Sequence, residues 1–122
     1  MTFAYDDSNI FARILRGEIP NRTVVETEHS LAFEDIQPQA PVHVLVIPRG
    51  PYMSLDHFLA EASEAEQLDF NRAVAAVIDK LDLSEGFRII ANARAHGVQD
   101  VPHYHLHILG GRRLGRMLPA EG

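Results

Sequence analysis

The chain has no cysteine, no tryptophan and no long apolar run. The absence of cysteine among 122 residues excludes disulfides, thiolate zinc sites and a cysteine nucleophile. No stretch reaches the roughly 18 apolar residues of a membrane helix, and residues 1–7 lack the charged head and apolar run of a secretion signal. We therefore expect a cytoplasmic protein that does not associate with a membrane.

Three common catalytic signatures are also missing. The sequence contains no Gly-x-Ser-x-Gly, which places a serine nucleophile, no Walker loop and no glycine-rich dinucleotide fingerprint. Acidic residues outnumber basic ones by 17 to 11, which gives a net charge of −6, and no basic block precedes residue 112. Non-specific nucleic-acid binding is disfavoured, although a single nucleotide needs only a local pocket.

The length and a hydrophobic content of 46% predict one domain over residues 1–122. Helices are expected at 10–15, after a Ser8-Asn9 cap, and from a capping box at Ser63 to about Leu81, with a helical turn at 56–59. Leu68, Phe70, Val74, Val77, Ile78 and Leu81 form the predicted apolar stripe of the long helix. Strands are expected at 23–27, 30–34, 42–48, 87–92 and 103–109, with the very apolar 42–48 in the middle of the sheet.

Three histidines alternate with apolar residues in His103-Tyr104-His105-Leu106-His107. Period two predicts a strand with all three imidazoles on one face and Tyr104, Leu106 and Ile108 on the other. Three buried imidazoles would make an unusual core, because every ring nitrogen needs a partner. A neutral imidazole is a nucleophile, and a protonated neighbour can assist a leaving group, so the pattern favours group transfer at phosphorus.

Two other interpretations of the three histidines stay open. A His-x-His pair on a strand can supply two ligands to a metal ion. Same-face neighbours on a strand lie roughly 7 Å apart and the outer pair roughly 13 Å, so two of the rings could share an ion far more easily than three. The other interpretation is structural or accidental. Group transfer by the histidines themselves needs no metal or other cofactor, and none is expected.

Four ordered blocks resemble the histidine-triad (HIT) family. They are residues 10–20, 32–41, 43–48 and 103–112, the last containing the alternating histidines and Gly110-Gly111-Arg112. The ending Gly-Gly-Arg is similar to the Hint branch, the purine nucleoside phosphoramidases. The resemblance implies an α+β fold, with a five-stranded antiparallel sheet, a short N-terminal helix and a long helix, and a homodimer that joins two sheets into one.

The resemblance also implies roles for individual residues. By similarity, His105 is the nucleophile that takes the nucleotidyl group, His107 binds the scissile phosphate, and His103 and His43 form an imidazole network that orients His105. Asp35 would bind the ribose hydroxyls. The base pocket would consist of Ile10, Phe11, Ile14, Phe33, Ile36 and Leu45. The phosphate contacts would come from Asn92, Gln99 and the backbone at Asp100 and Val101.

These roles imply hydrolysis of a purine nucleoside phosphoramidate to a nucleoside monophosphate through a nucleotidyl-histidine. Alternatives are a dinucleoside-polyphosphate hydrolase or nucleotidyl transferase, and a nucleotide-binding interaction protein with weak activity. The sequence departs from the Hint pattern at Asp100, where a serine is common, at Pro102, and in a tail without tryptophan. A carboxylate at position 100 would repel phosphate unless it points away or is neutralised, for example by Arg94.

Overall fold

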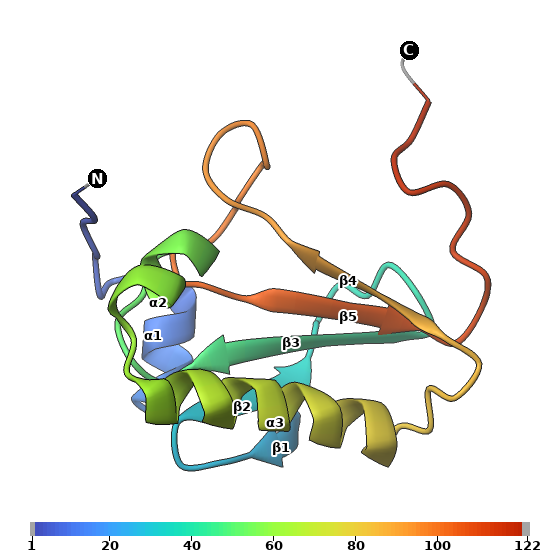
Figure 1. The fold of residues 1–122 in the computed structure, drawn as a ribbon, viewed down its shortest axis with the longest axis horizontal. Helices are drawn as coiled ribbons and strands as arrows, with labels where there is room; N and C mark the ends of the chain where they lie inside the picture. The colour runs from blue at the N-terminus through green and yellow to red at the C-terminus, as the bar shows by residue number, and fades with distance from the viewer. Residues whose placement is uncertain (1, 121–122) are drawn as a thin grey trace.

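The computed structural model describes residues 2–120, which form a five-stranded antiparallel sheet with three helices (Figure 1). The helices are α1 (Ile10–Leu15), α2 (Leu55–Glu61) and α3 (Glu64–Lys80). The strands are β1 (Thr23–Glu26), β2 (Ser30–Glu34), β3 (Val42–Pro48), β4 (Phe87–Ala91) and β5 (Leu106–Gly110). Their order across the sheet is β1-β2-β3-β5-β4, so the apolar strand β3 is central, as predicted.

The register between β3 and β5 determines which side chains share a face of the sheet, because opposed residues in an antiparallel pair point the same way. One face carries the pairs His43 with Leu109 and Leu45 with His107. The other face carries Val44 with Ile108 and Val46 with Leu106. The sheet therefore separates two histidines from the apolar core.

Helix α3 covers the apolar face along β1, β2 and β3 (Figure 1). The core on this side consists of Ala32, Val44, Val46, Phe58, Phe70, Ala73, Val77, Leu83, Tyr104 and Ile108. Leu68, expected in the apolar stripe of the helix, is instead 52% exposed. Two residues subtend roughly 200° around a helix, so Leu68 cannot share the buried side with Phe70.

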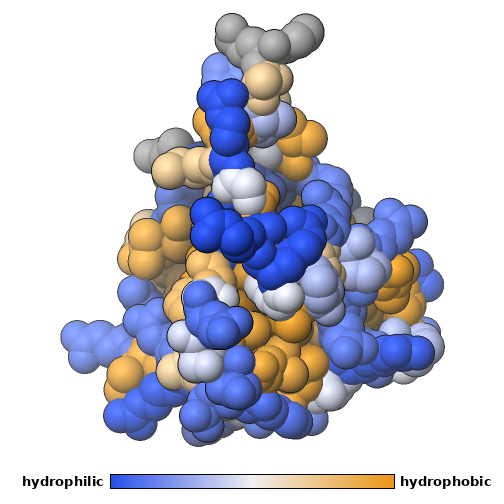
Figure 2. All heavy atoms as spheres, turned by 90° about the vertical axis from the view of Figure 1, so that its right-hand side faces the viewer, coloured by the Kyte–Doolittle hydropathy of each residue, from blue (hydrophilic) through white to orange (hydrophobic). Residues whose placement is uncertain are grey.

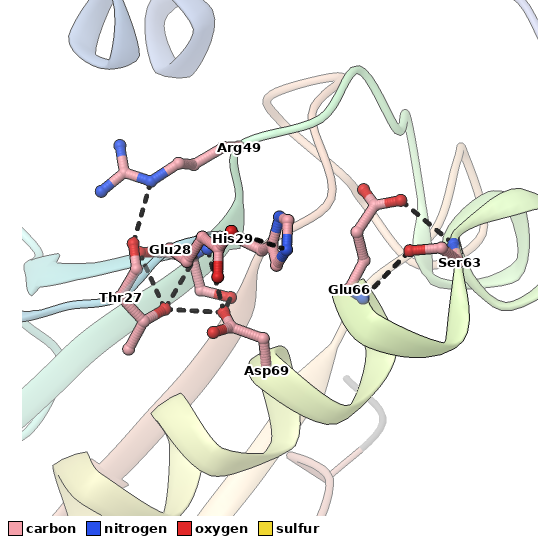
Figure 3. Close-up of polar contacts among 8 residues, drawn as sticks. Thr27, Glu28, His29, Arg49, Ser63, Glu66 and Asp69 are labelled. Carbon is pink, nitrogen blue, oxygen red and sulfur yellow. Dashed lines mark hydrogen bonds and ion pairs between the residues drawn. The ribbon is translucent and has the colours of Figure 1, made fainter.

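Polar contacts fix the start of α3 (Figure 3). The predicted capping box is present: Ser63 Oγ accepts from the Glu66 N–H at 3.1 Å, and Glu66 Oε1 accepts from the Ser63 N–H at 3.0 Å. One turn later, Asp69 accepts hydrogen bonds from Thr27 Oγ1 at 2.7 Å and Ser30 Oγ at 2.8 Å. These bonds join the helix to the turn between β1 and β2.

Helix α1 packs on the opposite face of the sheet. Asn9 caps it as predicted, because its Oδ1 accepts from the Ala12 N–H at 2.9 Å. A second apolar cluster joins the helix to β2 and β3 and contains Phe11, Ile14, Leu31, Phe33, Leu45 and Ile47. The histidines of β3 and β5 lie beside this cluster.

Two predicted elements differ from the structure by more than one residue at an end. Residues 56–59 belong to a longer helix, α2, so the fold has one helix more than expected. Strand β5 begins at Leu106 rather than His103, because the Tyr104 N–H donates to the Tyr52 carbonyl at 2.8 Å instead of to a neighbouring strand. The predicted alternation of faces still holds, since Tyr104 enters the core under α3.

The sheet ends at β4, whose outer edge pairs with no strand of residues 2–120. On this strand Phe87 is 45% exposed and Ile89 is 40% exposed. The end of the molecule with the C-terminal tail mixes apolar and strongly polar surface (Figure 2).

In the described part of the chain, no helix has both the length and the apolar character that a membrane span requires.

Candidate active site

The predicted histidines gather where β3 and β5 lie side by side. His43 lies on β3 and His107 on β5, and their ring centroids are 5.1 Å apart. His105, one residue before β5, lies with its ring centroid 5.1 Å from that of His107. The imidazole of His103 bonds to none of these three rings and has its own partners, Tyr5 and Pro48. The four histidines therefore form two hydrogen-bonded chains and not one network.

The first chain determines the tautomer of His107. The Gln39 N–H donates to His43 Nδ1 at 3.1 Å, so a neutral His43 carries its proton on Nε2. His43 Nε2 lies 2.9 Å from His107 Nδ1 and donates to it. His107 therefore carries its own proton on Nε2, the nitrogen on the far side of its ring. Asp35 Oδ2 lies 3.4 Å from His43 Nε2.

The second chain determines the tautomer of His105. His103 Nε2 donates to the Pro48 carbonyl at 2.8 Å, which leaves His103 Nδ1 to accept from the Tyr5 hydroxyl at 2.6 Å. The main-chain carbonyl of His103 accepts from His105 Nδ1 at 2.7 Å. His105 thus keeps a proton on Nδ1 and has a free lone pair on Nε2.

Burial keeps the supporting rings neutral. Desolvation lowers the pKa of His103 to about 4, against a weaker opposing effect of its bond to Pro48. Desolvation, with the neighbouring His105 and His43, lowers the pKa of His107 to about 4. The pKa of His43 is also lowered by burial, and Asp35 opposes that shift. At neutral pH these three rings are therefore uncharged donors and acceptors.

His43 and His103, both expected to orient His105, make different contacts in the structure. His43 contacts His107 and not His105. His103 does orient His105, but through its main-chain carbonyl, while its imidazole is bonded to Tyr5 and Pro48.

The loop before β5 brings a carboxylate to His105. Asp100 Oδ1 lies 3.6 Å from His105 Nε2, although the Asp100 side chain is 80% exposed. The neighbouring Gln99 amide is engaged inside the loop, because its Nε2 donates to the carbonyls of Met53 at 2.6 Å and Val101 at 2.9 Å. Its Oε1 accepts from the Arg94 N–H at 3.0 Å. Gln99 thus anchors the loop, whereas a phosphate contact was predicted for it.

The predicted base-pocket residues divide into two groups. Phe11, Ile14, Phe33 and Leu45 belong to the buried cluster under α1, and the Phe11 ring stands edge-on to His105 with centroids 5.0 Å apart. Ile10 and Ile36 are 42% and 89% exposed. An open cleft of about 660 Å³ lies beside Asp35, Ile36 and His43. The exposed Ile36 thus provides apolar surface in the cleft that His43 also lines.

Asn92 follows β4, where Ile90 lies opposite His107. Because side chains alternate along a strand, Asn92 continues the face that carries His107. Its side chain is partly buried, and strand alternation carried one residue past the end of β4 would place it on the histidine face of the sheet.

Asp35, His43 and His107 could hold a metal ion, since one ligand atom from each lies within 4.8 Å of the others. Coordination by His43 Nε2 would require that nitrogen to lose its proton and its bond to His107. The hydrogen bonds that set the tautomers therefore compete directly with metal binding.

Tyr5 is a site residue that the sequence did not reveal. It lies 98 positions from His103, outside any periodic element, and Asn9 Nδ2 donates to its hydroxyl at 3.0 Å. No local pattern marks such a contact. The Asn9 cap was the only nearby signal, and it predicted a helix start.

A family model described as the HIT domain matches residues 16–114. The chain belongs to the HIT family. A HIT-like protein of Azospirillum brasilense, described as uncharacterized, is 53% identical over 97% of this chain and 98% of its own length. The purine nucleoside phosphoramidase of Escherichia coli K12 is 41% identical over 95% of this chain and 98% of its own length.

Solved HIT structures share the fold. The HIT family hydrolase from Clostridium thermocellum has a TM-score of 0.80 and 32% identity, over 92% of this chain and 98% of that one. The histidine triad protein from Clostridium difficile has a TM-score of 0.79 and 33% identity, over 98% of this chain and 100% of that one. The predicted α+β HIT fold is confirmed, with α2 added.

Proposed function

We propose that this HIT protein hydrolyses purine nucleoside 5′-phosphoramidates to nucleoside monophosphates through a nucleotidyl group on His105. The observation that carries the proposal is the pair of tautomers, a free lone pair on His105 Nε2 next to an N–H on His107 Nε2. The nucleophile and the hydrogen-bond donor therefore have the required tautomers before substrate binds. The relative from Escherichia coli, named a purine nucleoside phosphoramidase, supports the choice of substrate.

In the first step, the lone pair of His105 Nε2 forms a bond to phosphorus while the P–N bond breaks. The electron pair of that bond goes to the leaving nitrogen, which takes a proton from solvent and departs as an amine. His107 Nε2–H donates to a phosphoryl oxygen and stabilises its charge. Positioned donors of this kind contribute about 10²- to 10³-fold to such reactions.

In the second step, a water oxygen forms a bond to phosphorus and the P–Nε2 bond breaks. Its electron pair returns to His105, and the proton of the water passes to solvent. The products are a nucleoside monophosphate and the free enzyme. Both steps use His105 as nucleophile and leaving group, so no metal or cofactor is needed.

The rest of the site would bind the nucleotide. Asp35 offers Oδ2 to the ribose hydroxyls, while its Oδ1 accepts from the Gln37 N–H at 2.8 Å and fixes the carboxylate. The base would lie against the α1 side of the site, on Ile10, Phe11, Ile14, Phe33, Ile36 and Leu45. Asn92 and the backbone at residues 100 and 101 would contact the phosphate.

We further propose that two copies pair through β4. The strand presents an unpaired edge together with the half-exposed side chains of Phe87 and Ile89. Exposed strand edges of this kind readily pair with another chain. Sedimentation of the protein should give a dimer, whereas a variant with Ile89→Lys should sediment as a monomer.

The experiment that tests the reaction is a single turnover of adenosine 5′-phosphoramidate, quenched in alkali and analysed by intact mass. A transient nucleotidyl adduct on the wild type, absent from His105→Ala, supports the proposal. His96→Ala, an exposed loop histidine, is the matched control and should keep both adduct and turnover. Faster turnover of a dinucleoside polyphosphate would assign that substrate class instead. Nucleotide binding without adduct or turnover would indicate a binding protein.

A further inference from the structure

The carboxylate of Asp100 faces the reactive nitrogen of His105. Its Oδ1 lies 3.6 Å from Nε2, the atom to which the nucleotidyl group would be attached. The loop that presents Asp100 is held on both sides, because Gln99 bonds to Met53 and Val101. The position of this charge is therefore built into the fold.

No lysine or arginine in the described part of the chain pairs with this carboxylate. Arg94, the basic residue of the same loop, is engaged elsewhere, since its guanidinium donates to both carboxylate oxygens of Asp56 at 3.1 and 2.9 Å. Over residues 2–120, Asp100 has no hydrogen bond or ion pair with a lysine or arginine. Its negative charge is thus available to His105.

The charge of His105 changes during the proposed reaction. The ring keeps its Nδ1 proton, which is donated to the His103 carbonyl at 2.7 Å. When Nε2 also forms a bond to phosphorus, both ring nitrogens are substituted and the imidazole becomes a cation. That cation exists only between the first and second steps.

We propose that Asp100 stabilises the nucleotidyl-imidazolium of His105 and so sets the balance between forming and hydrolysing the intermediate. The inference rests on the proposed function, because it concerns the same covalent step. A carboxylate near the developing cation accelerates bond formation. It also slows the second step, in which the cation returns to neutral imidazole.

Asp100 also repels the phosphoryl oxygens of the substrate. That repulsion acts in the bound substrate as well as in the adduct, so it weakens binding without favouring either chemical step. The two effects separate experimentally: the repulsion changes KM or the affinity for nucleoside monophosphate, whereas the imidazolium contact changes the two rate constants in opposite directions.

The test compares wild type with Asp100→Asn in rapid-quench single turnovers of adenosine 5′-phosphoramidate, with enzyme in excess, following adduct formation and decay. Because the side chain is exposed, we expect roughly threefold slower formation and roughly threefold faster decay, and so about tenfold less adduct relative to free enzyme. Both differences should shrink between about 50 mM and about 0.5 M salt as screening increases.

Two further variants serve as controls. Asp100→Glu keeps the charge and should keep adduct formation within a factor of about two of wild type. Asp79→Asn removes an exposed charge from α3, on the other side of the sheet, and should change neither rate.

The possible outcomes separate the two proposals. If Asp100→Asn slows both steps or changes neither while the wild type still forms adduct, the role of Asp100 is wrong and the covalent reaction stands. If the wild type turns over without any adduct, the proposed function itself is wrong and this inference falls with it.

Discussion

His43 Nε2 lies 2.9 Å from His107 Nδ1, and this single bond determines which nitrogen of His107 carries the proton. The direction of the bond is set one step earlier, by the Gln39 N–H that donates to the other nitrogen of His43. The main-chain amide of Gln39 therefore determines, through His43 on β3, that His107 on β5 carries its proton on Nε2. In the same way, the main-chain carbonyl of His103 holds the proton of His105 on Nδ1 and leaves a lone pair on Nε2.

Replacing His43 should uncouple this chain. In His43→Ala, His107 can move its proton to Nδ1 and lose the donor that faces the phosphate, so we expect kcat to fall about 10- to 100-fold. KM should change less, because the donor acts mainly on charge that develops during reaction. Steady-state kinetics on adenosine 5′-phosphoramidate measures both. Unchanged kcat would show that His43 does not control His107.

Removing the Tyr5 hydroxyl should act through His103. Tyr5→Phe leaves His103 Nδ1 buried without a donor, which should lower the free energy of unfolding by about 1 to 2 kcal/mol and kcat severalfold. Tyr52→Phe is the matched control, because its hydroxyl donates to Glu66 at 2.8 Å and bonds to none of the site histidines. It should lose stability without losing kcat. Equal kcat in the two variants would assign Tyr5 to stability alone.

The strands, and the face of the sheet that carries the histidines, could be predicted from the sequence because both follow from local periodicity. Alternation placed Tyr104 in the core and His105 on the opposite face, and the central position of β3 followed from its apolar run. The start of β5 was wrong because Tyr104 pairs with Tyr52, a contact across 52 residues that no local pattern encodes.

The polar partners of the site were less predictable for the same reason. Arg94 was a natural candidate to neutralise Asp100, since both lie in one loop, yet it bonds to Asp56 on α2, a helix expected only as a short turn. Main-chain partners such as the Pro48 carbonyl carry no sequence signature at all. The residue types in the sequence therefore indicate which residues could react, whereas the tautomers of the histidines depend on main-chain groups that only the folded structure brings close.

Removing metal ions should leave the activity intact. The ligand atoms of Asp35, His43 and His107 lie within 4.8 Å of one another, but two of them are already joined by the bond that orients His107. We therefore expect turnover of the phosphoramidate to be unchanged by a chelator. Stoichiometric zinc by elemental analysis, together with activity lost to the chelator and restored by zinc, would contradict the metal-free mechanism.

Stability should fall as the pH drops from 7 to 5, because His103 and His107 are buried as neutral rings. Each has a folded pKa of about 4 against an ordinary value of 6.5, so over this interval the unfolded chain binds more protons than the folded one. For the fully buried His103 the loss by pH 5 is about 2 kcal/mol or less. Asp56, whose pKa is lowered to about 2 by its bonds to Arg94 and Ser54, loses its contribution only at lower pH. Urea unfolding at the two pH values measures the difference in the free energy of unfolding. The control variant His96→Ala should show the same difference as the wild type. Equal stability at pH 7 and pH 5 would show that these rings are not held neutral by the fold.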